Sequence, residues 1–401
     1  MKSTYCKITN KKTHKVINFG KMPIANGFIK KKDLNNEFFF NLSVSFSEKI
    51  SLLQLDEHPQ PKMMFNSKYP FYTSSSKFMI SHFNSYANWA KKKYIKKNNS
   101  KIIEIGSNDG TFLKNFKKQN FEHLGFEPSK NVSDLANKNG VNSIPKFFNR
   151  NNLNRTENFL GNTDIIFGAN VVCHIPDLIE FIKTADLLLN ENGKIIFEEP
   201  YLGAMYKKTS YDQIYDEHIF IFSITSIKKI FDLFDFELID AIYQQTHGGS
   251  MRYVLQRKRK GNSNKKINKL LEYEKRENIN SLKGALKFKN NCELSKEKLL
   301  SKIKKIRRKG KRICGYGATS KSTTILNYCN IGTDFIDCIY DTTPDKIGKL
   351  SPGKHIPILD YRNFKNENYE YAFLFAWNHK KEIEKKEKNF LKKGGKWITH
   401  L

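Results

Sequence analysis

The stretch that most constrains how this chain can fold runs from Lys101 to Ser129, KIIEIGSNDGTFLKNFKKQNFEHLGFEPS. It begins with a short β-branched run, Lys101–Ile105, which predicts a buried strand. A turn with two glycines, Gly106 and Gly110, comes next, followed by apolar residues at helical spacing. A second short strand stops on Glu127. Strand, glycine turn, helix, strand and acidic residue is the plan of a nucleotide-binding βαβ unit, in which that carboxylate accepts hydrogen bonds from a ribose diol.

The charges of this turn favour a ligand without phosphate. The dinucleotide fingerprint G-x-G-x-x-G is absent, no lysine is positioned for phosphates, and Asp109 would repel a pyrophosphate. S-adenosylmethionine (AdoMet) carries a ribose and a positive sulfonium, which suit an acidic rim. The alternative is an ordinary tight turn with no ligand. Because Glu104 precedes the turn and Glu127 follows it, we predict a bound AdoMet, held by Glu104, Gly106, Ser107, Asn108, Gly110, Glu127, Pro128 and Asn170.

Length and composition bound the class of protein. The chain has 401 residues, enough for two or three domains, and 39% of them are hydrophobic, which allows sizeable cores. No apolar run approaches the ~18 residues of a membrane span, and the N-terminus lacks the apolar core of a signal peptide. Six scattered cysteines without a C-x-x-C spacing make no disulfide framework, so we expect a cytoplasmic protein.

The formal net charge of +30 is compatible with a polyanionic partner, either nucleic acid or a phosphorylated sugar. The charge also follows from heavy use of lysine throughout the chain, and no recognisable nucleic-acid module accompanies it. We therefore expect neither a nucleic-acid nor a membrane partner. The oligomeric state stays open.

The chain before the AdoMet unit predicts a small domain. Residues 1 to 70 carry strand-like patches between irregular segments. Cys6 stands alone there, and His14 and His58 have no metal-ligand spacing, so we predict no metal. The aromatic and hydroxyl-rich turn Tyr69–Ser76 is either a substrate-contacting lid or a loop leading into a helix from about Lys77 to Lys97.

From residue 101 to about 255, predicted strands and helices alternate. Alternation of this kind indicates a parallel, doubly wound sheet, with ligands at the carboxyl ends of its strands. We therefore expect the polar groups that end these strands to surround one crevice. They are Gly106–Gly110, Glu127, Asn170–His174 and Glu198–Tyr201.

Two polar clusters follow the last of these strands. In the segment Tyr211–His218, Glu217 and His218 are a plausible base-and-partner pair, since histidine titrates near neutral pH and a carboxylate can orient it. The alternative is a surface loop whose histidine caps the next helix. The segment Thr246–Arg252 contains two glycines that let backbone approach a ligand and an arginine for an anion, or it is a turn leading into a strand.

The C-terminal part predicts a second nucleotide-binding unit. A strongly charged stretch, Lys258 to about Arg308, predicts one or two helices that join domains. After it, the turn Gly315-x-Gly317 meets a helix N-terminus with Ser320 and Lys321, which suits a diphosphate. We expect a second Rossmann-like domain here, with a purely structural glycine turn as the alternative.

These motifs resemble one known family, the sugar C-methyltransferases that act on nucleotide-linked keto-deoxysugars. The similar segments keep the family's order over nearly the whole chain: EIGSNDGTFL, GFEPSKNV, NVVCHIPDL, IYDEH, HGGSMR, GYGATSK, Tyr340 through Pro357, and FAWN. The resemblance implies an N-terminal zinc-binding-like domain (1–70), an AdoMet-binding methyltransferase domain of Rossmann-like α/β fold (71–257), and a helical linker with a Rossmann-like nucleotide-sugar domain (258–401).

The resemblance also predicts that the zinc ligands are largely lost. The family's first C-x-x-C pair falls here on Cys6 and Thr9, and the second falls near Ser47 and Ile50. The family's Y-H-E-H motif is Tyr215-Asp216-Glu217-His218 in this chain, which replaces one histidine by an acid.

The reaction implied is AdoMet-dependent methylation of a carbon next to the ketone of a nucleotide-diphosphate-linked deoxysugar, through a base-generated enolate. His218 is then the expected base, Tyr215 and Glu217 orient it or stabilise the enolate, and His174 lies near the transferred methyl. The alternative is an AdoMet-dependent O- or N-methyltransferase acting on another glycan precursor. The expected substrate-binding residues are Tyr69, Tyr72, His247, Gly248, Ser250, Arg252, Gly315, Gly317, Ser320, Lys321, Tyr340, Asp341, His355 and Asn378.

Overall fold

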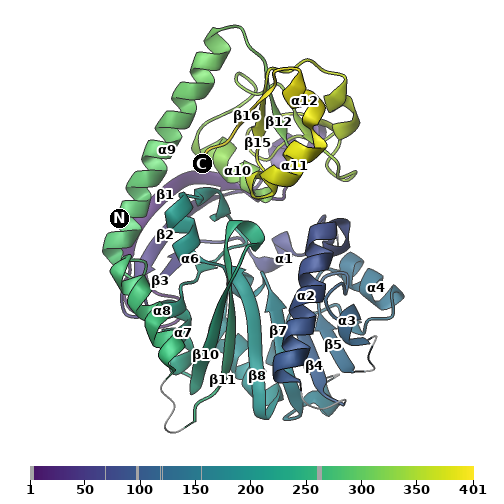
Figure 1. Cartoon of the computed structure of the whole chain (residues 1–401), viewed down its shortest axis with the longest axis vertical. Helices are drawn as coiled ribbons and strands as arrows, with labels where there is room; N and C mark the ends of the chain where they lie inside the picture. The colour runs from purple at the N-terminus through teal and green to yellow at the C-terminus, as the bar shows by residue number, and fades with distance from the viewer. Residues whose placement is uncertain are drawn as a thin grey trace.

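The computed structural model describes residues 4–67, 69–95, 99–117, 119, 121–154, 156–259 and 264–401. Its strands form three sheets, which occupy the N-terminal, central and C-terminal parts of the chain. The central sheet lies at one end of the molecule and the C-terminal sheet at the other (Figure 1). Among the described residues, no helix is both long enough and apolar enough to cross a membrane.

The N-terminal sheet is antiparallel, with the strand order β1-β2-β3-β9. Its first three strands are β1 (His14–Pro23), β2 (Phe39–Ser47) and β3 (Leu52–Leu55). The fourth, β9 (Phe220–Ile221), comes from the central part of the chain and pairs with β3. The predicted small β domain therefore exists, but it is completed by a strand that follows Tyr211–His218 directly.

The central sheet has seven strands in the order β10-β11-β8-β7-β4-β5-β6. Five of them are parallel: β4 (Lys101–Ile105), β5 (Glu122–Phe126), β6 (Ser143–Ile144), β7 (Thr163–Ala169) and β8 (Leu189–Pro200). The hairpin β10 (Phe236–Gln244) and β11 (Ser250–Arg257) adds two antiparallel strands beside β8. The predicted parallel sheet is thus extended at this edge by two antiparallel strands, because a tight hairpin joins antiparallel strands.

Both faces of the central sheet are buried, which explains the apolar composition of β4. Ile102 packs in one cluster with Phe83 and Tyr86 of α2 (Lys77–Tyr94), while its neighbour Ile103 packs in another with Phe181. Successive side chains of a strand point to opposite faces, so a strand covered on both sides needs apolar residues at each position. The predicted end of α2 at Lys97 lies outside the described residues.

The remaining helices that flank this sheet and continue the chain after it have the following bounds: α1 (Pro61–Met64), α3 (Lys114–Lys117), α4 (Lys130–Lys138), α5 (Leu178–Leu188), α6 (Leu202–Lys208) and α7 (Ile224–Asp232).

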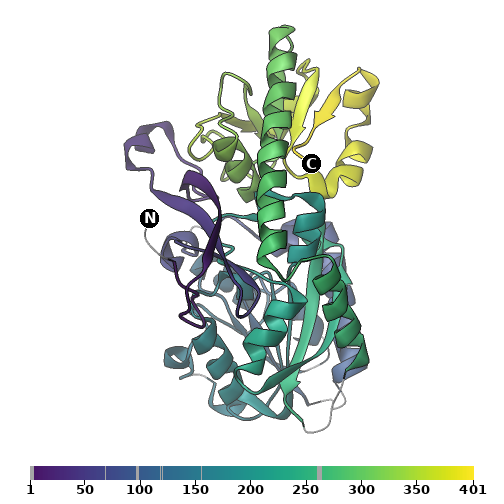
Figure 2. The same ribbon diagram turned by 90° about the vertical axis from the view of Figure 1, so that its left-hand side faces the viewer.

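The charged linker forms two helices, as predicted, namely α8 (Lys265–Arg276) and α9 (Leu282–Arg308). Helix α9 runs from the central domain along the C-terminal domain, with the N-terminal strands beside it (Figure 2). Cys292, Leu299 and Ile303 are buried along one side of α9, so the helix is held by packing over much of its length.

The C-terminal domain is the predicted second Rossmann-like unit. Its parallel sheet has the order β14-β13-β12-β15-β16. The strands are β12 (Ile313–Tyr316), β13 (Ile339–Asp341), β14 (Ile358–Asp360), β15 (Tyr371–Leu374) and β16 (Lys396–Ile398), and the helices are α10 (Ser320–Tyr328), α11 (Lys380–Lys386) and α12 (Lys388–Lys392). The strand order changes direction at β12, and α10 begins just after that strand, where such sheets bind ligands.

The segment Tyr211–His218, called the junction loop here, lies where the three domains meet. Its Asp212 is completely buried and accepts hydrogen bonds from Trp377 Nε1 at 2.7 Å and His400 Nε2 at 3.0 Å, both in the C-terminal domain. The carbonyl of Ile214 accepts another from Thr324 Oγ1 of α10 at 2.8 Å.

The N-terminal domain holds the other end of the junction loop. Asp216 Oδ1 accepts the backbone N–H of Ala25 at 3.0 Å, and Glu217 Oε1 accepts a hydrogen from Asn26 Nδ2 at 2.8 Å. Thr323 of α10 in turn donates to the carbonyl of Ala25 at 2.8 Å. Hydrogen bonds from two neighbouring domains thus fix a loop that belongs to the central one.

Candidate active site

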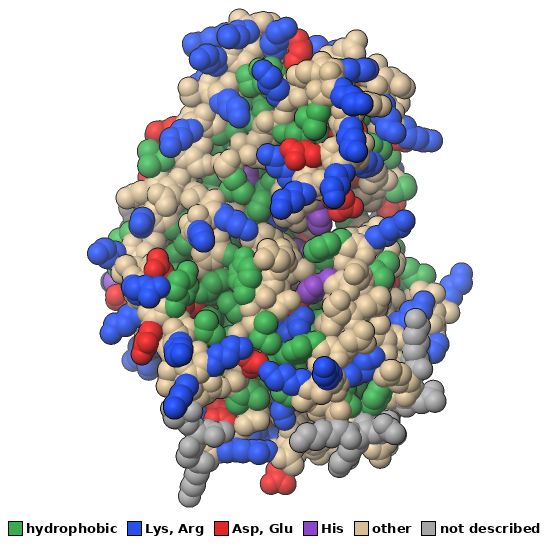
Figure 3. All heavy atoms as spheres, viewed as in Figure 1, with side chains coloured by type: hydrophobic (Ala, Val, Ile, Leu, Met, Phe, Trp, Pro, Cys, Tyr) green, Lys and Arg blue, Asp and Glu red, His purple; other side chains and the backbone are tan. Residues whose placement is uncertain are grey.

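A cavity of about 1070 Å³ lies between the central sheet, the junction loop and the C-terminal domain. Histidine side chains are visible where the surface is hollowed between these two domains (Figure 3). The predicted site residues that line it are Tyr69, Tyr72, Glu104, Gly106, Ser107, Asn108, Glu127, Pro128, Asn170, His174, Tyr215, Glu217, His218, His247, Ser320, Lys321 and Asn378. The cavity exceeds the usual size of a small-molecule site, so it has room for a cofactor and a substrate together.

The carboxylate of Glu127 is held by the backbone at the end of β5. Its Oε1 accepts the N–H of Ser129 at 2.8 Å, and its Oε2 accepts the N–H of Asn108 at 3.1 Å. Burial raises the pKa of Glu127. Each carboxylate oxygen can accept more than one hydrogen bond, so both keep acceptor capacity for a ligand in the cavity.

The two glycines of the cofactor turn are required by packing. Gly106 has φ +64°, and a Cβ there would lie 2.7 Å from Val171 Cγ2. Gly110 has φ +78°, and a Cβ there would lie 2.9 Å from Val141. Gly110 is absent from the described residues that line the cavity; it shapes the turn, and its contact with the cofactor stays a prediction.

The turn also holds the aromatic segment Tyr69–Ser76. Asn108 Oδ1 accepts the N–H of Thr73 at 2.9 Å, and Asp109 Oδ2 accepts the N–H of Ser74 at 2.8 Å. Tyr69 and Tyr72 both line the cavity. This segment is therefore part of the cavity wall and is docked on the cofactor turn.

Several buried polar atoms in the cavity wall have no hydrogen-bond partner among the described residues. They are Glu104 Oε2, Asn149 Oδ1, Asn170 Oδ1 and His174 Nε2. Buried polar atoms are nearly always paired, so these four indicate a polar ligand. Burial, together with the nearby Asp109 and Glu127, raises the pKa of Glu104 well above its usual value. Acceptor oxygens in an acidic wall suit a ligand with an ammonium and a sulfonium, and the site fits AdoMet.

His218 is buried and neutral. Its Nδ1 lies 2.6 Å from the carbonyl oxygen of Gln213, which can only accept, so Nδ1 carries the proton. The other nitrogen, Nε2, then accepts a hydrogen bond from the Tyr215 hydroxyl at 2.9 Å. Burial lowers the pKa of His218 to about 4. The surface-loop alternative is excluded, because only 5% of this side chain is exposed.

Glu217 does not partner His218 as expected. Within the described part of the chain its carboxylate is bonded to Asn26, and the hydrogen-bond partner of His218 Nε2 is Tyr215. The sequence could not show this, because Asn26 lies 191 positions earlier in the chain. Burial raises the pKa of Glu217 to about 7, so its carboxyl group is partly protonated at neutral pH.

His174 lies in a stack of three rings. Its ring centroid is 5.2 Å from that of His218 and 5.6 Å from that of Phe65, with planes inclined by 20° and 17°. Burial and the neighbouring His218 and His247 lower the pKa of His174 well below its usual value, so it too is neutral. Sequence reasoning missed Phe65, which has no motif around it to mark it.

The C-terminal wall of the cavity is basic. Lys321 Nζ lies 3.4 Å from Asn378 Oδ1, and burial lowers the pKa of this lysine. Lys346 also lines the cavity and donates to the carbonyl of Ala318 at 2.7 Å. Sequence reasoning missed Lys346, whose lysine-rich surroundings gave no reason to single it out.

Arg252, Ser250 and Gly248 do not reach the cavity as described. The guanidinium of Arg252 donates to Glu198 through Nε at 2.7 Å and lies 3.9 Å from the ring centre of Tyr86, so it is not available to an anion. Ser250 donates to the carbonyl of Thr246 at 3.1 Å. Gly248 makes room for Trp377, because a Cβ there would lie 2.2 Å from the indole. Their contacts with substrate stay a prediction.

The polar end of β8 has a structural role instead of the expected place in the crevice. Glu198 pairs with Arg252 and, at 2.6 Å, with His82 Nε2. The Tyr201 hydroxyl donates to Glu274 at 2.9 Å. These groups form hydrogen bonds and ion pairs with neighbouring side chains behind the cavity wall. The general tendency of ligands to bind at the carboxyl ends of parallel strands does not predict such pairings.

In the C-terminal domain, five further residues predicted to contact the substrate are not among the described residues that line the cavity. His355 Nε2 pairs with Glu37 at 2.7 Å, away from the cavity. Tyr340 is buried among aromatic side chains, with its ring centre 5.5 Å from that of Phe364. Asp341 accepts the backbone N–H groups of Ala318 at 2.6 Å and Thr343 at 2.7 Å, so it braces the loops that line the cavity.

The two glycines of the turn in the C-terminal domain are also absent from the described residues that line the cavity. Gly315 lies within β12, where a Cβ would come 2.8 Å from Ile339 and Phe375. Gly317 has φ +84° and turns the chain from β12 toward α10. The cavity is reached instead by Thr319, Ser320 and Lys321, at the start of that helix.

Comparisons with known proteins agree with this arrangement. Family models match in chain order a putative zinc binding domain over residues 6–65, a methyltransferase domain over 81–241 and a C-methyltransferase C-terminal domain over 245–401. The C-methyltransferase NovU of Streptomyces niveus is 27% identical over 388 residues, which cover 96% of this chain and 92% of that protein.

Two solved structures resemble part of the chain. One is magnesium protoporphyrin IX methyltransferase of Synechocystis PCC 6803 with bound AdoMet, at 11% identity and a TM-score of 0.34, covering 45% of this chain and 79% of that one. The other is a putative methyltransferase of Haloferax volcanii in complex with the Trm112 activator, at 10% identity and a TM-score of 0.39, covering 46% of this chain and 95% of that one.

The seven-stranded sheet, its cofactor turn and the matching methyltransferase model define an AdoMet-dependent methyltransferase. Its flanking domains give a more particular similarity. The C-terminal part matches the C-methyltransferase C-terminal domain model, and nearly the whole chain is similar to a C-methyltransferase.

The N-terminal domain of this chain does not fit the zinc ion that its family model implies. At the expected positions, Cys6 Sγ accepts the N–H of Thr9 at 3.4 Å, while the hydroxyls of Thr9 and Ser47 are buried with no partner in the described structure. Ile50 is 1% exposed and offers only hydrocarbon. One thiol, two hydroxyls and an isoleucine do not form a structural zinc site, which uses cysteine and histidine ligands.

Replacing Glu127 tests the cofactor end of the cavity. Glu127→Ala removes a carboxylate with free acceptor capacity, and we expect the dissociation constant for AdoMet to rise roughly 10- to 100-fold, as for the loss of one or two hydrogen bonds to a charged group. Isothermal titration calorimetry measures this. Glu122→Ala, at the exposed start of the same strand, is the matched control and should leave the affinity unchanged. Equal affinity in both variants would contradict the assignment.

Proposed function

We propose that the protein transfers the methyl group of AdoMet to a carbon next to the ketone of a nucleotide-diphosphate-linked deoxysugar. The observation that carries the proposal is the junction loop, where a neutral, buried His218 and the Tyr215 hydroxyl bonded to it line the same cavity as the cofactor turn. A base of this kind is needed only when the acceptor atom carries a proton that must be removed, as a carbon next to a ketone does.

The proton leaves the substrate through the Tyr215–His218 pair. The Tyr215 oxygen accepts the proton from the acidified carbon while its own proton passes to His218 Nε2, which gives a substrate enolate and an imidazolium. When bound, AdoMet supplies the electrophilic methyl group that the enolate carbon attacks. Tyr215 is well suited to relay because burial, together with nearby Glu217, raises its pKa well above the usual value and keeps it protonated at rest.

Glu217 stabilises the enolate oxygen. Its carboxyl group, in the junction loop, lines the cavity, and with its pKa raised to about 7 it can donate a hydrogen bond at neutral pH. A donor directed at developing negative charge in a buried site lowers the barrier to proton abstraction. Asn26 holds this carboxyl group in place from the N-terminal domain.

The basic wall binds the nucleotide diphosphate. Lys321 and Lys346 bring positive charge to the cavity, and the first backbone N–H groups of α10 lie at the same wall. Helix N-termini and lysines are common binding groups for phosphate oxygens. Binding at this wall would position the sugar ring between the cofactor turn and the junction loop, so that remote contacts orient the reacting carbon.

The direct test of the proposal follows a deuterium atom on the acceptor carbon. With a nucleotide-linked keto-deoxysugar deuterated next to its ketone, the wild-type protein should release the deuterium with each methyl transferred, as mass spectrometry of the product would show. His218→Gln should lower methyl transfer by about 10²- to 10⁴-fold while AdoMet still binds. The exposed His14→Gln is the control. A methylated product that keeps its deuterium would favour transfer to oxygen or nitrogen instead.

The pH dependence of the rate tests the role of Glu217. A group with its pKa raised to about 7 is protonated below that pH, so the rate should fall as the pH rises above 7 and Glu217 loses its proton. Glu217→Gln keeps a hydrogen-bond donor that does not titrate, so this alkaline decrease should disappear. A decrease of unchanged midpoint in the variant would show that another group is responsible. At the acid end the rate should hold until the pH nears 4, where His218 becomes protonated.

A further inference from the structure

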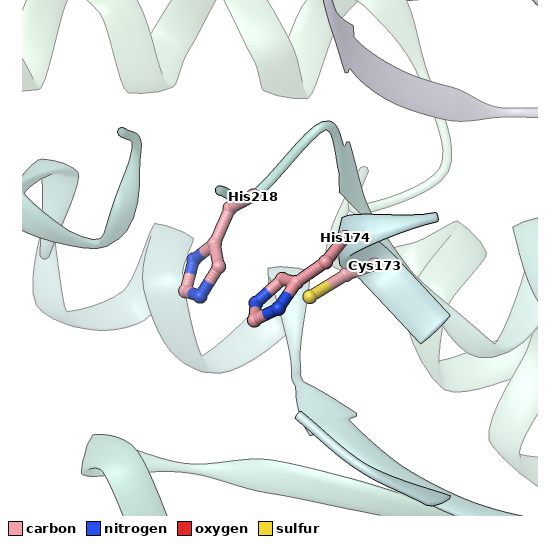
Figure 4. Close-up of side chains that lie close together, drawn as sticks. All are labelled: Cys173, His174 and His218. Carbon is pink, nitrogen blue, oxygen red and sulfur yellow. The ribbon is translucent and has the colours of Figure 1, made fainter. Parts of the chain in front are cut away.

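Three side chains, one of them His218 of the proton-transfer pair, make up a set of potential metal ligands. Cys173 and His174 belong to the turn after β7, and His218 ends the junction loop. One potential ligand atom from each of the three lies within 4.8 Å of the others. The ring of His174 lies between the ring of His218 and the thiol of Cys173 (Figure 4).

The group is organised as a binding site for a cation that prefers sulfur and nitrogen. Zinc bonds of about 2.0 Å to nitrogen and 2.3 Å to sulfur leave tetrahedral ligand atoms roughly 3.3 to 3.8 Å apart, so the side chains need to approach by no more than about 1.5 Å. His174 Nε2 is buried without a hydrogen-bond partner in the described structure. A cation that binds this nitrogen therefore breaks no hydrogen bond of the described structure. Both histidines of the set line the cavity, which gives the cation a way in.

A carboxylate behind the thiol completes the arrangement. Glu199 lies close to the Cys173 thiol, and its Oε1 is fixed by the N–H groups of Val171 at 3.1 Å and Val172 at 2.7 Å. A doubly charged cation on one thiolate and two neutral imidazoles keeps one net positive charge. An ionised Glu199 close to the site balances that charge, so the site with its bound cation has no net charge.

We propose that Cys173, His174 and His218 form an inhibitory site for a thiophilic divalent cation such as zinc. Binding displaces the proton of Cys173 into solvent, and the Tyr215 hydroxyl gives up its hydrogen bond to His218 Nε2 so that this nitrogen can bind the cation. The fourth coordination position then faces the cavity. The metal site does not depend on the proposed function, but inhibition does, because it follows from occupying the lone pair that accepts the substrate proton.

Binding is tested on the full-length protein without substrate, using Co²⁺ as a coloured probe for zinc. The wild-type protein should show a thiolate-to-cobalt charge-transfer band that added Zn²⁺ removes, at one metal per chain. Cys173→Ser should lose that band, whereas Cys6→Ser, in the domain whose family model implies zinc, should keep it. The same band in wild type and Cys173→Ser, or its absence from the wild type, would overturn the site.

A second variant and an activity measurement complete the test. If Cys173→Ser fails to fold, His174→Gln should weaken Co²⁺ binding at least 10-fold while circular dichroism stays unchanged. Because Cys173 does not line the cavity, Cys173→Ser should keep its basal methyl transfer and resist Zn²⁺ concentrations that inhibit the wild type. Equal inhibition of both proteins, or activation of the wild type by Zn²⁺, would overturn the inhibitory role. If the wild-type protein transfers no methyl group when no metal is added, that result counts against the proposed function and not against the metal site.

Discussion

The fixed, buried position of the junction loop is the constraint on which the rest of the structure depends. Asp212 is bonded to Trp377 and His400, and Glu217 is bonded to Asn26, so residues near both ends of the chain hold one loop of the central domain. Unpaired buried carboxyl groups are costly, and these partners satisfy them. The three domains therefore have to meet for the loop to take this form, and His218 faces the cavity only because they do.

This meeting of domains gives the cavity two ends of opposite charge. The cofactor end is acidic, with Glu104, Asp109 and Glu127 close together, and the far wall carries Lys321 and Lys346. A sulfonium and a diphosphate are each stabilised by the opposite charge, and burial strengthens both effects. The small N-terminal domain has no fitting zinc site, yet it contributes to the active centre through Asn26, which holds Glu217 of the junction loop.

The sequence predicted the cofactor unit and the second Rossmann-like domain well, because glycine turns and strand-end residues are set by local backbone geometry. It predicted the partners of charged groups poorly. Glu217 was paired with its neighbour His218, whereas its actual partner is Asn26, far away in the chain. Arg252 was assigned to a ligand anion, but Glu198 and aromatic rings enclose it. Such partners depend on tertiary packing, which no local pattern encodes.

The central claim is that cofactor and sugar share one cavity at the Tyr215–His218 pair. A crystal structure with S-adenosylhomocysteine and a nucleotide-linked keto-deoxysugar tests it most directly. The account predicts both ligands in this cavity, with the diphosphate at Lys321 and Lys346 and the carbon next to the ketone between the sulfur and the Tyr215 hydroxyl. A sugar bound elsewhere, or one whose acceptor atom faces away from Tyr215 and His218, would contradict it.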